Sequence, residues 1–219
     1  KNDILTMSVR RTINGATVRM IEEQSVVFGI ISDFQPIAYA NHFFAASQFT
    51  PDPASDTFSV PHLVGETVYA WTDKGQYGPF VVPPSGDVVL DVEVSVASIG
   101  LLDNTHEAEL LDIPAQAKDG SSIGRKKKLS SGSGIMLHKT AAGTVSTVER
   151  NFMQPEHVSA PQALVPQGIA ADLVTAYSGV AELEANSGYA DEVSMRFKPV
   201  GGAPMTLLSV IPSIEETGP

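Results

Sequence analysis

Residues 62–96, HLVGETVYAWTDKGQYGPFVVPPSGDVVLDVEVSV, decide the fold that this sequence predicts. The stretch holds Val-rich runs that Asp-Lys-Gly, Pro-Pro and Ser-Gly-Asp separate. In the last run, residues 88–96, apolar and polar side chains alternate, which is the pattern of a strand with one buried face. Short strands between turn residues predict a small antiparallel sandwich or barrel. The expected strands are residues 67–72, 77–82, 88–96, 99–102 and 108–113.

An Asn-Gly pair, Asn14-Gly15, divides the N-terminal stretch ILTMSVRRTINGATVRMIEE into two strand-like runs. Asn-Gly supplies the positive φ angles of a two-residue hairpin turn, and such a turn fixes the register of its strands. That register sets Arg10 opposite Arg19. Because like charges across a strand pair repel, we expect one of the two to reach an acidic partner elsewhere. The other expected pairs are Ile13 with Ala16, Arg11 with Val18 and Val9 with Met20.

The rest of the chain repeats strands and turns. The sequence therefore predicts an all-β protein with little helix, built of small antiparallel β-sandwich or barrel modules joined by Pro- and Gly-rich loops. Residues 37–47 are expected to form a short helix or a docking loop, and the prolines at residues 51, 53 and 61 mark a joint. The expected divisions are residues 1–50 (hairpin plus docking segment, continuing a missing N-terminal part), 51–115 (a small sandwich or barrel) and 116–219 (a second antiparallel region with a Pro-rich arm at 153–168).

Composition limits the classes of function. The 219 residues are 42% hydrophobic and 18% charged, which is typical of a globular chain long enough to bury a core. The formal net charge of −11 disfavours a protein that grips nucleic acid through its phosphates. No apolar run approaches the roughly 20 residues of a membrane-spanning helix. With no cysteine, the chain predicts no disulfide framework and no thiolate metal site.

Seven residues are candidates for contact with a partner. The basic run RKKK indicates either a solvated loop or a contact to an acidic neighbouring subunit, and it has no interleaved aromatic residue for stacking on bases. Trp71 is expected to be at least half buried, against the strand at 88–96 or against a neighbouring subunit. The candidates are Phe43, Phe44, Trp71, Arg125, Lys126, Lys127 and Lys128, with residues 37–49 and 153–168 as larger contact segments.

No catalytic, cofactor or metal site is predicted. Residues 120–124, GSSIG, match the Gly-x-Ser-x-Gly nucleophile elbow, but they lack the buried strand before it and the helix after it. The five histidines are scattered, without the close pairs that are usual in zinc sites. The acidic stretch DNTHEAELLD, residues 103–112, lacks the Asp spacing and central Gly of a calcium loop, which leaves an adventitious divalent ion as a minor alternative.

Four segments, taken in order, resemble the tail tubular protein B, or nozzle, of short-tailed (podovirus-type) bacteriophages. They are MSVRRTINGATVRMIEE, VPHLVGETVYAWTDKGQYGPFVVPPSGDVVL, GRKKKLSSGSGIML and GGAPMTLLSVIPSI, and they span nearly the whole chain. The first is similar to the family's strand, Arg, tight turn and strand ending in Ile-Glu. The second is similar to a His-Leu-x-Gly-x-x-Val stretch with an Asp-x-Gly turn. In the first segment the matching residues are Val9, Arg11, Asn14-Gly15, Ile21 and Glu22.

The resemblance implies a structural virion protein that is not an enzyme. Family nozzles form a homo-hexameric ring below the portal and adaptor, carry tail fibres or spikes, and line the channel of DNA ejection. This chain would be the C-terminal part of such a protein, assembled in the host cytoplasm and located in the virion tail. Its acidic surface would let DNA pass without sticking. The alternatives are a different virion protein built on the same β modules, a receptor-binding or adhesin-like β-sandwich tail module, and a cell-surface polysaccharide hydrolase.

Overall fold

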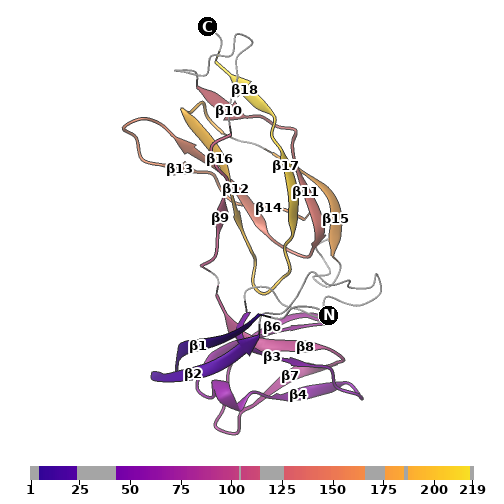
Figure 1. Cartoon of the computed structure of the whole chain (residues 1–219). Coiled ribbons are helices and arrows are strands. Elements are labelled where there is room, and N and C mark those ends of the chain that lie inside the picture. Colours follow the sequence, from indigo (N-terminus) through magenta and orange to yellow (C-terminus); the bar gives the residue numbers. More distant parts are fainter. Residues whose placement is uncertain are drawn as a thin grey trace. The chain divides into compact units, whose positions relative to one another are not determined.

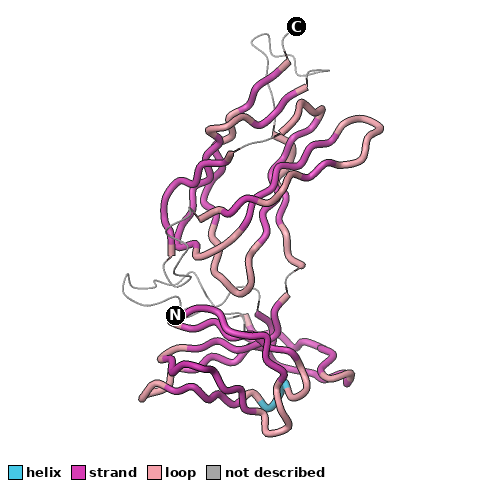
Figure 2. The backbone as a smooth tube through the Cα atoms, turned by 180° about the vertical axis from the view of Figure 1, so that it is seen from behind, coloured by secondary structure: helices cyan, strands magenta, loops and turns pink. Residues whose placement is uncertain are grey.

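The computed structural model describes residues 5–23, 43–103, 105–113, 126–165, 176–184 and 187–217. Strands make up most of these ranges, and the one helical element within them is a single 3-10 turn, η1 (Pro61–Leu63) (Figure 2). All of the strand pairs are antiparallel, in several small sheets, which confirms the predicted all-β fold class. Within the described ranges, no helix has the length and apolar character needed to cross a membrane.

The chain divides into two compact units. Unit 1 comprises Lys1–Asn104, Asp172–Thr175 and Gly201–Pro204, and unit 2 comprises Thr105–Ala171, Ala176–Val200 and Met205–Pro219. This differs from the three predicted divisions. The N-terminal hairpin has no core of its own, since its Ile13 is buried in the same cluster as Val68 and Ile99. Residues 108–109 pair with a strand of unit 2, so the boundary falls near residue 104 and not near residue 115.

Unit 1 contains a four-stranded sheet in the order β3-β8-β5-β6, a two-stranded sheet of β4 and β7, and the hairpin of β1 and β2 (Figure 1). Side chains of all three contribute to one apolar core. The strands are β1 (Thr6–Ile13), β2 (Ala16–Glu23), β3 (Phe43–Phe49), β4 (Ser55–Ser59), β5 (Thr67–Thr72), β6 (Gly75–Val81), β7 (Asp87–Val94) and β8 (Ala97–Leu102).

The hairpin has the predicted register, with every expected pair in place. Asn14 and Gly15 adopt φ angles of +46° and +74°, as a tight hairpin turn requires. Arg10 does face Arg19, but neither is ion-paired with any residue that the structure describes, so the expected acidic partner is not found there. The ion pair of the hairpin is instead Arg11–Glu22, on the face turned to the core, with Nη2 and Oε2 2.6 Å apart.

Strand β7 shows the predicted alternation. Val88, Leu90 and Val94 are buried, whereas Asp91 and Glu93 are exposed. The segment before it differs from the prediction, because residues 43–49 form a strand, β3, and neither a helix nor a docking loop. β3 pairs with β8 through an irregularity between Phe44 and Ser47, where Ala45 has a φ of +49°, and this break hides the two-residue period in the sequence. Residues 37–42 lie outside the described ranges.

Unit 2 is a sandwich of two main sheets. One has the order β13-β12-β16-β9, with β14 also paired to β12; the other has the order β15-β11-β17; β10 and β18 form a separate pair. Its core is built from inward-facing residues of both sheets, such as Ile135, Val145 and Phe197. The strands are β9 (Ala108–Glu109), β10 (Lys127–Leu129), β11 (Ser133–Thr140), β12 (Thr144–Arg150), β13 (His157–Val158), β14 (Gln162–Ala163), β15 (Tyr177–Leu183), β16 (Glu192–Lys198), β17 (Leu207–Ile211) and β18 (Ile214–Glu216).

The Pro-rich arm is extended, as predicted, over its described part. Its two short strands, β13 and β14, both pair with β12 of the same unit. Leu164 and Val165 at the end of that part are buried. Residues up to 165 therefore complete the sandwich of unit 2, and residues 166–168 lie outside the described ranges.

Candidate functional site: the basic run and the charged cluster of unit 2

The predicted aromatic candidates lie in unit 1. Phe43 and Phe44 on β3 are partly buried, and the guanidinium of Arg11 lies over the ring of Phe44, 5.0 Å from its centroid. Trp71 is 1% exposed, which confirms its predicted burial. Trp71 does not belong to the apolar cluster that holds the buried residues of β7. Its neighbour Ala70 does, and successive residues of a strand point to opposite faces, so Trp71 lies on the other face of β5. Trp71 is therefore buried within the chain, and its place in a contact with a partner stays a prediction.

The three described lysines of the basic run have different surroundings. Arg125 lies outside the described residues, Lys126 precedes β10, and Lys127 and Lys128 lie on it. Lys126 is exposed and donates to Asn151 Oδ1 over 3.1 Å. Lys128 pairs with Glu215 at 2.9 Å and lies over the ring of Tyr189. The hydrogen bond with Glu215 raises the pKa of Lys128.

Lys127 is the member of the run that points into unit 2. It is 5% exposed, and its ammonium donates to Asp112 Oδ2 over 2.6 Å and to the carbonyl oxygen of Ile113 over 2.7 Å. The other oxygen of Asp112 accepts the backbone N–H of Val193 over 2.8 Å. Lys127 therefore links β10 to residues 112–113 and, through Asp112, to β16. Removing the carboxylate would leave a buried ammonium without a counter-ion, which strongly destabilises a folded protein. The pair of Lys127 and Asp112 therefore contributes to the stability of unit 2.

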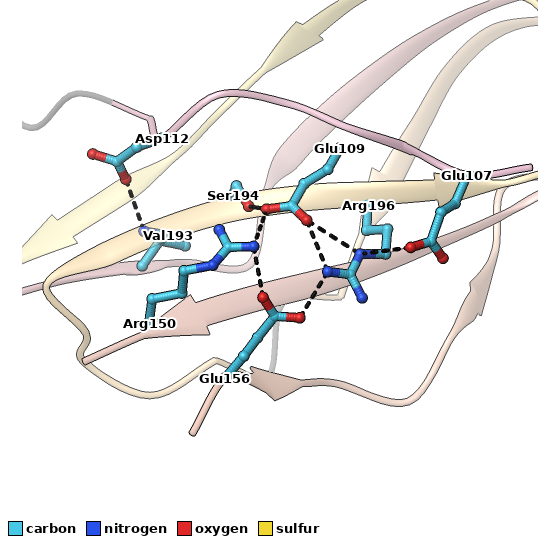
Figure 3. Close-up of polar contacts among 8 residues, drawn as sticks. All are labelled: Glu107, Glu109, Asp112, Arg150, Glu156, Val193, Ser194 and Arg196. Carbon is cyan, nitrogen blue, oxygen red and sulfur yellow. Dashed lines mark hydrogen bonds and ion pairs between the residues drawn. The ribbon is translucent and has the colours of Figure 1, made fainter. Parts of the chain in front are cut away.

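A charged cluster covers the outer face of the β12–β16–β9 sheet (Figure 3). Arg150 and Arg196 each bind both Glu109 and Glu156, over distances of 2.6 to 2.8 Å. Glu107 lies at 3.7 Å from Arg196 Nε. The strands supply Glu109, Arg150 and Arg196, and the turn after β12 supplies Glu156, so the cluster ties four segments together.

The cluster holds its carboxylates ionised. Burial by itself would raise the pKa of Glu109, but hydrogen bonds from Arg196, Ser194 and Arg150 outweigh it and lower the pKa to about 2. A hydrogen bond from Arg196 also lowers the pKa of Glu156. The Glu109 and Glu156 bonds in turn raise the pKa of Arg196. Neither carboxylate resembles the general acid of a glycosidase, whose pKa is raised.

The position of the cluster shows what it does in the fold. Val148 and Ser194 pair with each other on the outer face of the sheet, yet both are buried. Ser194 Oγ donates to Glu109 Oε1 over 2.8 Å. The arginine and glutamate side chains therefore close over an apolar and a hydroxyl side chain that would otherwise meet water.

Three acidic side chains of the stretch 103–112 have basic partners in unit 2. In the stretch 103–112, Glu107 and Glu109 bind arginine, and Asp112 binds Lys127. Their counter-ions are side chains of the same unit. Among the residues that the structure describes, no group of three or more His, Asp or Glu is placed to hold a metal ion. The GSSIG motif falls outside the described ranges.

Sequence reasoning missed the cluster because its members lie at residues 107, 109, 150, 156 and 196, and no local spacing links them. The weak signal available was the alternation of Glu192, Ser194, Arg196 and Lys198 along one strand face. The comparisons with known proteins add no family. No protein-family model matches the chain, and no curated protein matches its sequence.

Proposed function

We propose that the chain is a structural subunit of a phage tail nozzle, a ring that forms part of the DNA-ejection channel and carries tail fibres or spikes. The observation that carries the proposal is the N-terminal hairpin. Arg11 and Glu22, two of the residues on which the resemblance rests, pair with each other on the face of the hairpin that packs on unit 1. The resembling segment is thus a structural element with a defined register, which supports the proposal.

The charge distribution supports a wall along which DNA slides. Unit 1 has 13 acidic and 5 basic side chains, a net charge of −8, and unit 2 has 12 and 9, a net charge of −3. An acidic wall repels phosphates, so DNA passes without being held. Two rigid β units also suit a part whose product is shape, because strand ladders and packed cores deform little.

The alternatives have less support. A polysaccharide hydrolase needs a carboxyl group with a raised pKa, and Glu109 and Glu156 have lowered ones. A receptor-binding module would gather aromatic side chains in a hollow, whereas Phe152, the most exposed aromatic residue among those that the structure describes, lies on a turn.

The test is removal of the protein from particles. The protein's mass should be measured alone and with its tail partners, and particles made without it should be examined for genome retention. We expect a ring-sized assembly and particles that lose their DNA or lack the tail tip. A protein that stays monomeric with its partners, cleaves cell-surface polysaccharide and leaves tails intact when deleted would overturn the proposal in favour of the hydrolase.

A further inference from the structure

The turn between β12 and β13 presents two large apolar side chains to solvent. Phe152 is 85% exposed and Met153 is 91% exposed. The turn stands out from the body of unit 2 in both views (Figures 1 and 2). A lone exposed apolar residue is ordinary, but two adjacent ones of this size at the tip of a projecting turn are typical of an anchor for a partner.

Polar contacts fix the turn in place. The backbone N–H of Phe152 donates to Asp191 Oδ2 over 2.9 Å, and that of Gln154 donates to the carbonyl oxygen of Asn151 over 3.1 Å. Lys126 holds the side chain of Asn151, and the Arg150–Glu156 pair closes the base of the turn. The two apolar side chains therefore project from a preorganised backbone, which lowers the entropy lost on binding.

Met153 occupies a conformation that the fold alone would assign to glycine. It is the third residue of the turn and has a φ of +63°, where a Cβ is costly. Its side chain is almost fully exposed, so it gains little packing energy within the unit. A strained residue that gains nothing inside the fold points to a gain outside it.

The charge near the turn selects the partner. Lys126, bound to the turn through Asn151, is exposed, and the rest of the chain is strongly acidic. The outer face of β7 in unit 1 is complementary. There Val89 is 58% exposed, and acidic residues stand two positions away on either side, at Asp87 and Asp91. Neither of these carboxylates is ion-paired with a described residue.

We propose that the turn Asn151–Gln154 of one copy of this chain docks on the outer face of β7 of the next copy. Phe152 and Met153 would cover Val89, and Lys126 would meet the flanking aspartates. This inference rests on the proposed ring and names its subunit contact. Two different faces of one chain make a head-to-tail contact, which closes into a ring when the rotation allows.

Engineered disulfides test the contact, because the chain contains no cysteine. The variant with Met153→Cys and Val89→Cys should give, on mild oxidation of the assembled protein, a ladder of covalent oligomers up to the ring. The control pairs Met153→Cys with Val81→Cys, a residue that is 69% exposed on β6, and should give no ladder. A ladder from the control of equal strength, no ladder from the first pair, or a cross-link to a different tail protein would each overturn the contact.

A second variant separates docking from folding. Met153→Gly relieves the backbone strain, so we expect a higher melting temperature and, in the same protein, self-association weakened at least about tenfold. A variant that associates as well as the wild type would overturn the inference. If rings still form and tails still hold DNA in that case, only this contact fails. If the wild type forms no ring and its deletion leaves tails intact, the proposed function fails too.

Discussion

Two pairs of arginines lie on the outer faces of antiparallel strands, and they differ in whether carboxylates bridge them. In unit 2, Arg150 and Arg196 are bridged by Glu109 and Glu156, and together they cover the sheet beneath them. In unit 1, Arg10 and Arg19 face each other across the hairpin, and neither forms an ion pair with a carboxylate of the described residues. The neighbouring Ile21 is 80% exposed.

The comparison shows that charged side chains on a sheet stabilise the fold in one unit and destabilise it in the other. The cluster in unit 2 satisfies its own members and shields Val148, so it belongs to the stability of the sandwich. The arginine pair in unit 1 weakens the hairpin that carries it, since like charges opposite each other repel. Substitutions at the two places should therefore have opposite signs.

Removing the central carboxylate of the cluster should have the largest effect. Glu109→Gln deprives Arg150, Arg196 and Ser194 of a charged acceptor, and we expect a loss of about 2 kcal/mol in the free energy of unfolding. Urea denaturation measures it. The matched control is Glu107→Gln, at 3.7 Å from Arg196 and half exposed, which should cost much less. Equal losses would mean that the cluster is only a set of surface charges.

Acid should reproduce part of this loss. The pKa of Glu109 is lowered to about 2 from 4.5, so its contribution is present above the unfolded value and disappears as the pH falls from about 4.5 toward 2. The loss due to Glu109 stays partial at pH 2, because at its folded pKa the carboxyl group is still about half ionised. Other carboxyl groups titrate in both proteins, so the difference between the wild type and Glu109→Gln isolates Glu109. Over this window the unfolding free energy of the wild type should fall more steeply than that of Glu109→Gln. Parallel curves would contradict the lowered pKa.

The inner face of β12 offers an opposite case within the same strand. Thr147 is 1% exposed, and its hydroxyl has no hydrogen-bond partner among the described residues. Thr147→Val keeps the shape and removes the unpaired hydroxyl, so we expect a gain of about 1 kcal/mol, read from the urea midpoint. Thr147→Ser keeps the hydroxyl and is the control that should not gain. A loss with Val would indicate that the hydroxyl is hydrogen-bonded after all.

The smallest effect is expected in the hairpin. Arg19→Glu turns the repulsive pair into an attractive one and should stabilise the protein by about 0.5 kcal/mol at low salt, and less at high salt. The double variant with Arg10→Glu restores like charges and should return to wild-type stability. Thermal melting at two salt concentrations suffices. A destabilising Arg19→Glu would mean that Arg19 contributes a favourable contact that the comparison leaves out.

Local signals in the sequence predicted much of the fold. The Asn-Gly turn set the whole register of β1 and β2, and the alternation at residues 88–96 placed the buried face of β7. Both depend only on residues close in sequence, because turn geometry and side-chain direction are local properties. The interruption in β3 was not predictable, since an irregular pairing breaks the two-residue period.

The functional surfaces depended on contacts between distant residues. The charged run at 125–128 suggested a patch, but on β10 the side chain of Lys127 points inward and binds Asp112. This direction depends on how β10 pairs with β18, which the local sequence does not reveal. Similarly, the spacing of Glu109, Arg150 and Arg196 carries no sign that three strands bring them together. The Met153 turn was hidden because its strain is a backbone property, and nothing in the residue type reveals it.

The buried lysine has a practical consequence. The Lys127 ammonium lies 2.7 Å from the Ile113 carbonyl oxygen, and both residues belong to unit 2. Residues 113 and 127 are thus fastened to each other. Lengthening the chain between two fixed points costs only about 0.6 kcal/mol per doubling. A peptide tag or a fluorescent protein inserted between residues 114 and 125 should therefore leave unit 2 folded, and would let the protein be followed in living cells.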